Sequence, residues 1–203
     1  IPWVTHDFVL EGGSLDTDGQ GTLLTTEQCL LNPNRNPSLR RTDIEERLTR
    51  WLGIQKVIWL HDGLEGDDTD GHIDDITRFV APGTVVTVVE PDPKDANHAP
   101  LQENLARLRS AQDAKGQPLQ IIELPMPPRS DGPHHRNPAS HANFYIGNSA
   151  VLVPTFASPT DAIVLDRLRP FFPDRKVVGI DCRDLVAGLG AIHCITQQMP
   201  AIP

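Results

Sequence analysis

The sequence repeats one order of predicted elements, strand, strand, helix and strand, about three times with a period of roughly 60 residues. The second unit shows this order most clearly. Residues 73–80 and 84–90 are apolar runs on either side of a Pro-Gly turn, residues 101–112 carry leucines at helical spacing, and residues 119–124 are a closing strand. The other units are predicted from residues 21–31, 42–52 and 56–60, and from residues 143–146, 150–154, 161–171 and 176–180. The pattern predicts an α/β fold, either an ordinary mixed sheet or a propeller-like ring with a site on its axis.

Local signals add finer expectations. Thr42 and Glu45 have the spacing of a capping box at the start of the first long helix, and Gly53 is expected to end that helix. Cys29 and Cys182 fall within apparent strands, so a structural role is expected for both.

Composition limits the classes of partner. The 203 residues are expected to form one domain, residues 1–203, and the formal net charge is −9. An acidic chain does not suit nucleic acid or an anionic membrane, whereas it would attract a small cationic substrate. An odd number of cysteines and the lack of a signal peptide or a long apolar run favour a reducing, cytoplasmic location.

Two segments could hold a metal ion, and neither is expected to do so. Residues 134–141 contain three histidines at irregular spacing, which favours a solvated or lid-like loop. Residues 66–79 place five carboxylates around one histidine, but they lack the alternating ligands and the later glutamate of a calcium loop.

Near the end of the sequence, the segment GLGAIHCITQQMP surrounds Cys194. Small residues before the cysteine allow the backbone to turn tightly. A thiolate is a strong nucleophile when positive charge lies near it, although most cysteines that are not in disulfides are structural. Cys194 is therefore a candidate nucleophile.

His72 and Asp74 are the second candidate pair, within GDDTDGHIDDITRF. Residues two apart on an extended strand point to the same face, so an imidazole would lie beside a carboxylate able to bind a cation. The alternative is a solvated acidic turn. Glu11, in FVLEGGS, is a third candidate because it ends an apolar run just before two glycines; by itself it would be an ordinary strand-end glutamate.

Five strings in this order, LEGGS, TTEQCLLNPNRNP, DDTDGHIDD, NFYIGN and HCITQQ, resemble the agmatine deiminase family. These enzymes belong to the guanidino-group modifying superfamily together with bacterial-type peptidylarginine deiminases. The resemblance covers nearly the whole chain. It implies the pentein fold, a five-bladed α/β propeller of ββαβ modules, of which this chain would contain about three.

The resemblance also implies roles for the candidates. Cys194 would be the nucleophile, His72 the acid/base, Glu11 the group that orients His72, and Asp74 the carboxylate that grips the guanidinium. Asp68, four residues before His72, is a further candidate for a contact near the substrate entrance. The family's R-D-x-G-P motif, which carries a second substrate-binding aspartate, does not occur here. The chain begins at Ile1 without Met, so the sequence is expected to start after that motif.

The activity implied is hydrolysis of a C–N bond in agmatine, giving N-carbamoylputrescine and ammonia in putrescine biosynthesis, with no metal or organic cofactor. The nearest alternative is a peptidylarginine deiminase with the same chemistry on protein-bound arginine. A further alternative is a non-catalytic chain that binds guanidino ligands without turnover. The resemblance makes a homo-oligomer plausible.

Overall fold

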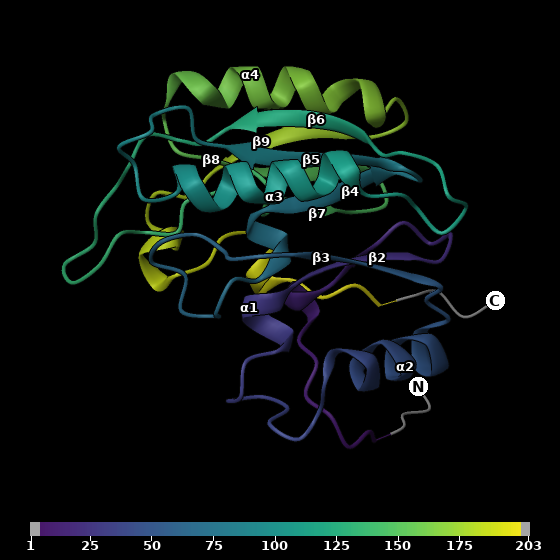
Figure 1. Cartoon of the computed structure of the whole chain (residues 1–203). Helices are drawn as coiled ribbons and strands as arrows, with labels where there is room; N and C mark the ends of the chain where they lie inside the picture. The colour runs from purple at the N-terminus through teal and green to yellow at the C-terminus, as the bar shows by residue number, and fades with distance from the viewer. Residues whose placement is uncertain (1–4, 200–203) are drawn as a thin grey trace.

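The computed structural model describes residues 5–199, which form three three-stranded sheets (Figure 1). The first module contains β1 (Asp16–Thr17), β2 (Thr22–Thr26), α1 (Glu27–Leu30), α2 (Arg41–Leu52) and β3 (Lys56–Leu60). The second contains β4 (Thr77–Ala81), β5 (Thr84–Val89), α3 (His98–Ser110) and β6 (Gln120–Pro125). The third contains β7 (Tyr145–Ile146), β8 (Ala150–Thr155), α4 (Pro159–Leu168) and β9 (Lys176–Asp181).

Every module has the same topology. Its first strand pairs antiparallel with its second, and a helical connection then leads to a third strand that is parallel to the second. A parallel pair needs such a crossover, because a tight turn can join only antiparallel neighbours. The predicted strand–strand–helix–strand repeat is thus confirmed for the described residues.

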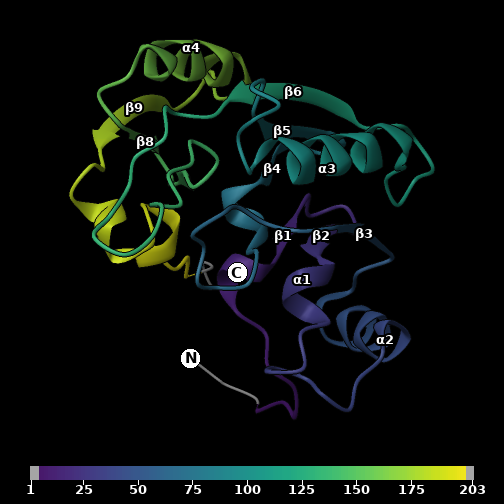
Figure 2. The same cartoon turned by 60° about the vertical axis from the view of Figure 1, so that its left-hand side comes forward.

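One hydrophobic core runs through the three modules. It includes Leu24 of β2, Val86 of β5 and Val153 of β8, all fully buried. The helices join neighbouring modules, since α3 packs on β3 as well as on β5, and α4 packs on β6 as well as on β9. In Figure 2 the modules form an arc, and the segments before β1 and after β9 approach each other on its inner side.

Three local predictions were wrong, two of them because a side chain bonds to a nearby backbone group. The predicted strand 21–31 ends at Thr26, whose Oγ1 accepts the Cys29 N–H at 3.2 Å and caps α1; Cys29 is therefore helical. The predicted capping box is absent: Asp43 caps α2 by accepting the Arg40 N–H at 2.8 Å, while Glu45 accepts the indole N–H of Trp59. The third case, residues 73–80, begins with a 3₁₀ turn and not with a strand.

Cys182 was also misplaced, by one residue. It follows β9, where its buried N–H donates to the Thr155 carbonyl at 2.9 Å. Gly53 ends α2 as predicted, in a left-handed conformation with φ of 69° that a glycine adopts without strain. The expectations about Ile1 concern residues outside the described range.

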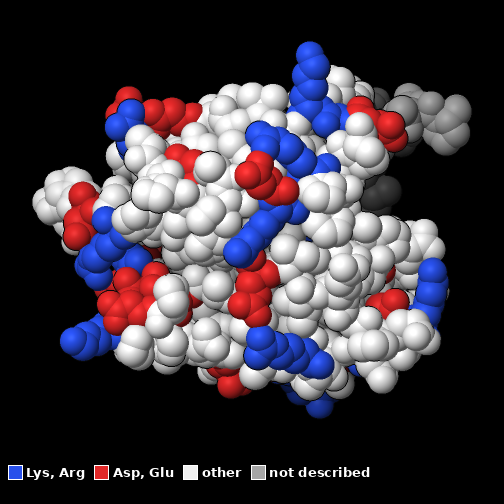
Figure 3. Space-filling model, turned by 90° about the horizontal axis from the view of Figure 1, so that it is seen from above, with Lys and Arg blue, Asp and Glu red and all other residues white. Residues whose placement is uncertain are grey.

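Charges of both signs intermingle on the face drawn in Figure 3, so the net charge of −9 does not gather into one patch there. Within residues 5–199 the longest helices are too short or too polar to cross a lipid bilayer.

Arg78 of β4 connects the three modules. Its Nε donates to Asp16 of β1 at 3.1 Å, and its Nη1 donates to the carbonyl of Phe144, just before β7, at 2.8 Å. The guanidinium also lies 5.0 Å from the centre of the Phe144 ring. Burial raises the pKa of Asp16, although Arg78 and the Phe79 N–H oppose the shift.

Arg78→Met should therefore lower the free energy of unfolding by about 3–5 kcal/mol, because it leaves Asp16 without its counter-charge and removes the side-chain donor to the Phe144 carbonyl. Urea denaturation would measure the loss. The matched control is Arg183→Met, since Arg183 pairs with Asp181 at an exposed site and its loss should leave stability nearly unchanged. Equal effects of the two substitutions would contradict a central role for Arg78.

Candidate active site

A cavity of about 450 Å³ opens between the segment before β1, the loop before β4 and the segment after β9. All the site residues predicted from the sequence line it: Glu11, Asp68, His72, Asp74 and Cys194. The fold thus brings together residues that lie up to 183 positions apart in the chain, from 11 to 194. Asp68 is one of the residues that line the wall of this cavity.

The loop before His72 is held by one carboxylate. Asp67 accepts the N–H groups of Gly71 at 3.0 Å and His72 at 3.1 Å. The Thr26 hydroxyl donates to the Gly71 carbonyl at 2.6 Å. These bonds fix the backbone that presents His72.

His72 and Asp74 face the cavity, but not for the predicted reason. They are not on an extended strand: His72 precedes the 3₁₀ turn Ile73–Asp75, and Asp74 lies within it. Both side chains lie against Gly13, where a Cβ would be 2.5 Å from His72 Nδ1 and 3.0 Å from Asp74 Oδ2. Only glycine at position 13 leaves room for them.

Asp74 is completely buried and has one oxygen free. Its Oδ2 lies 2.6 Å from His193 Nδ1 and accepts from Asn143 Nδ2 at 3.1 Å. Its Oδ1 is buried and has no hydrogen-bond partner. A buried acceptor without a partner is costly, so this atom is suited to a ligand that donates.

Cys194 lies in a 3₁₀ turn, His193–Ile195, at the mouth of the cavity. Its Sγ is 3.1 Å from Asn143 Nδ2 and 3.9 Å from Asp74 Oδ2. The residue as a whole is exposed, but its sulfur lies against the side chains of Asn143 and Asp74. This desolvation, with the negative charges of Asp75 and Asp74, raises the pKa of the Cys194 thiol to about 12.

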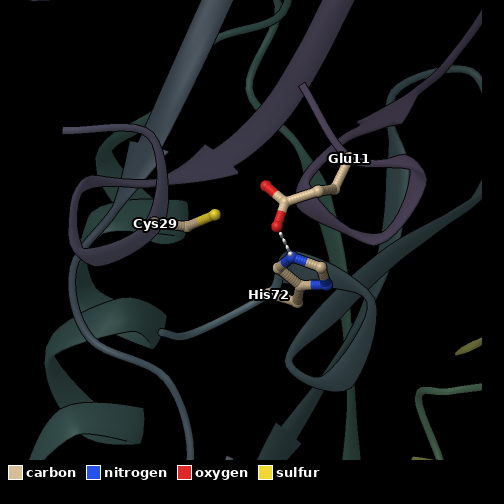
Figure 4. Close-up of side chains that lie close together, drawn as sticks. All are labelled: Glu11, Cys29 and His72. Carbon is tan, nitrogen blue, oxygen red and sulfur yellow. Dashed lines mark ion pairs between the residues drawn. The ribbon is translucent and has the colours of Figure 1, made fainter. Parts of the chain in front are cut away.

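Glu11 bonds to an arginine that the sequence did not single out. Arg35 donates to both carboxylate oxygens of Glu11, at 2.6 and 2.9 Å, and a third bond joins it to Asp70 at 2.9 Å. Partial burial by itself would raise the pKa of Glu11, but the hydrogen bonds and charge of Arg35 outweigh it, and the pKa is lowered. Glu11 Oε1 lies 3.5 Å from His72 Nε2 (Figure 4).

Sequence reasoning missed Arg35, Asn143, His193 and Gly13. Signals for all four existed, since each lies in one of the strings that resemble the family. Asp75 was missed as a distinct group. It is buried beside Asp74, and burial together with the Asp74 and Asp67 charges raises its pKa. The contacts of these site residues depend on how the segment before β1, the loop before β4 and the segment after β9 pack together.

Residues 134–141 are not a solvated loop throughout. His141 is fully buried: its Nδ1 lies 2.9 Å from the Pro154 carbonyl and its Nε2 lies 2.9 Å from Thr160 Oγ1. Burial lowers the pKa of His141. This histidine is satisfied by protein groups, which removes it from the three considered as metal ligands. Two other groups of side chains have metal-binding donors close together: Glu11, Cys29 and His72, and Asp74, Asp75 and Cys194.

Comparison with known proteins adds to this geometry. A family model described as Porphyromonas-type peptidyl-arginine deiminase matches residues 1–200. The agmatine deiminase of Pseudomonas fluorescens is 41% identical over 97% of this chain and 58% of its own length. The solved structure of the agmatine deiminase of Enterococcus faecalis superposes with a TM-score of 0.91 and 39% identity, covering 97% of this chain and 58% of that one. The substrate-bound agmatine deiminase of C. jejuni gives a TM-score of 0.86 and 37% identity, covering 93% and 55%. The chain thus spans a little over half the length of these relatives.

The raised thiol pKa predicts how Cys194 reacts with iodoacetamide. Because only the thiolate reacts, the alkylation rate should rise about tenfold per pH unit from pH 6 to pH 10 without levelling off. Mass spectrometry would follow the modification. The Cys194→Ser variant measures the background alkylation of the buried Cys29 and Cys182. A plateau below about pH 9 would contradict the raised pKa.

Arg35→Met should raise the pKa of Glu11, because burial then acts against His72 alone and no longer against the guanidinium. A carbon-detected NMR titration of the glutamate carboxyl groups would measure it, with Glu11→Gln to assign the signal. The control is Arg40→Met, since Arg40 pairs with exposed Asp43 and not with Glu11. A Glu11 pKa that stays low in Arg35→Met would show that another group sets it.

Proposed function

The chain belongs to the Porphyromonas-type peptidyl-arginine deiminase family, and from this premise we propose that it carries the hydrolytic site of an agmatine deiminase. The reaction would convert agmatine and water to N-carbamoylputrescine and ammonia. The observation that carries the proposal is the convergence of Cys194, His72 and the free Asp74 oxygen on one cavity. The likeness to agmatine deiminases supports the choice of substrate.

Binding would begin with the charge of the substrate. The free Oδ1 of Asp74 can accept charge-assisted hydrogen bonds from the N–H groups of the planar guanidinium. The cation would then lie near Cys194, whose sulfur is 3.9 Å from the other Asp74 oxygen. A positive charge there offsets the carboxylates that hold the thiol protonated, so substrate binding itself would favour the thiolate.

The chemistry then follows in two steps. The Cys194 thiolate attacks the guanidinium carbon, and His72 donates a proton to the departing ammonia, which leaves a covalent amidino-thioether. Water attacks the same carbon, His72 takes its proton, and the C–S bond breaks to free Cys194. Glu11 would orient His72, and Arg35 would hold Glu11 ionised for that purpose.

The three ββαβ modules support a larger proposal about architecture. In the full pentein ring five such modules would surround the site, and the family's second substrate-binding aspartate would come from a module that precedes this sequence. The homo-oligomer and the cytoplasmic location belong to the same proposal. The alternative is a non-catalytic chain that binds guanidino ligands without turnover.

Ammonia release from agmatine, free arginine and an arginine-containing peptide would decide among these functions. Turnover of agmatine alone supports the proposal. Turnover of the peptide would identify a peptidylarginine deiminase, which is the activity in the family's description. Binding of agmatine without ammonia release would identify the non-catalytic alternative.

Two substitutions test the roles of the residues. Cys194→Ser should abolish ammonia release, because a hydroxyl is a far weaker nucleophile, while thermal unfolding stays unchanged. Asp74→Asn should raise KM for agmatine at least about tenfold, because it removes a charge-assisted contact. Normal turnover in Cys194→Ser would contradict the assigned nucleophile, and unchanged KM in Asp74→Asn would place the guanidinium elsewhere. Asp166→Asn, at an exposed site on α4, is the matched control.

A further inference from the structure

Glu11, Cys29 and His72 present three different metal-binding donors to one another (Figure 4). A carboxylate oxygen, the thiol sulfur and a ring nitrogen all lie within 4.8 Å of one another. They come from the segment before β1, from α1 and from the loop before β4. We propose that these side chains bind a thiophilic divalent cation of the Zn²⁺ class, and that its binding blocks the proposed hydrolase by occupying His72.

An unsatisfied atom points to a ligand here. His72 Nε2 is buried and has no hydrogen-bond partner, and the His72 side chain is only 10% exposed. Cys29 is fully buried, and its sulfur points toward the Glu11 carboxylate in Figure 4. A sulfur, an imidazole nitrogen and a carboxylate oxygen are the donors that Zn²⁺ takes in proteins, whereas Mg²⁺ and Ca²⁺ prefer oxygen alone.

The spacing needs only a small adjustment. Zn²⁺ bonds of about 2.0–2.3 Å in a tetrahedral arrangement place neighbouring ligand atoms roughly 3–4 Å apart. Glu11 Oε1 and His72 Nε2 are already 3.5 Å apart. The sulfur must move inward by about 1 Å at most, which a side-chain rotation on the short helix α1 can supply.

Protons and charges can be followed through the binding step. Burial raises the pKa of the Cys29 thiol to about 12, so the free site holds a neutral thiol. Zn²⁺ forms a bond to sulfur as the S–H bond breaks, and one proton leaves to solvent. Arg35 opposes the incoming cation by its charge, but Glu11 keeps a lone pair for the metal because each carboxylate oxygen can accept twice.

The experiment must distinguish binding at this site from binding at the second group of donors. Asp74, Asp75 and Cys194 also lie within 4.8 Å of one another, and they include the proposed nucleophile. A cation bound there would inhibit as well, but through Cys194. Because the two groups use different cysteines, the identity of the bound sulfur tells them apart.

Co²⁺ is the probe, because a cobalt–thiolate bond gives a charge-transfer absorption in the near ultraviolet. The full chain, Cys194→Ser and Cys182→Ser should all show this band, and Cys29→Ser should lose it. His72→Gln should weaken Co²⁺ binding at least about tenfold, because loss of a partner that only supports a metal ligand typically costs that much. Thermal unfolding without metal would confirm that each variant folds.

The proposal is overturned if the wild-type chain shows no band, or if the band survives in Cys29→Ser and disappears in Cys194→Ser. None of these spectra requires turnover, so they decide the site even if the proposed function fails.

Inhibition is the second measurement, and it rests on the proposed function. Cys29→Ser should release ammonia from agmatine at the wild-type rate, since Cys29 is not part of the proposed chemistry. The Zn²⁺ concentration that halves the rate should rise at least about tenfold in this variant. Equal sensitivity of the variant and the wild type to Zn²⁺ would overturn the proposed block at His72.

Discussion

The buried guanidinium of Arg78 is the interaction on which the arrangement of the three modules depends. It reaches from β4 to Asp16 of β1 and to the carbonyl of Phe144 before β7, so one side chain joins the first strand of each sheet. A buried charge is tolerated only when it is paired and hydrogen-bonded, and this requirement fixes the relative positions of its partners. The cavity lies beside this contact, between the segment before β1, the loop before β4 and the segment after β9.

The site is built on turns whose geometry is set by short side chains. Asp67 holds the backbone before His72, and Gly13 leaves the space that His72 and Asp74 occupy. Neither residue contributes a group to the proposed chemistry. Both act by determining where a reactive group lies, which is how a rigid scaffold keeps catalytic groups in register.

The electrostatics of the cavity favour a cation and disfavour a free thiolate. Burial and the nearby Asp75 and Asp74 raise the pKa of Cys194, so the proposed nucleophile would stay protonated until positive charge arrives. Arg35 pairs with both Glu11 and Asp70 and offsets part of their negative charge. The proposed substrate and the proposed inhibitory cation are both attracted by the same excess of carboxylates, but they would engage different cysteines.

The sequence by itself determined the repeat, because its apolar residues recur about every two residues in the strands and every 3.6 residues in the helices. It also determined which residue types could react, since Cys194, His72, Asp74 and Glu11 stand out beside glycines and in distinctive strings. Only the tertiary structure decided what surrounds them. The turn at residues 73–75, the pairing of Arg35 with Glu11 and the approach of Cys29 to His72 arise from contacts across distant segments. Local propensity carries no information about those contacts, because each depends on where a different part of the chain is packed.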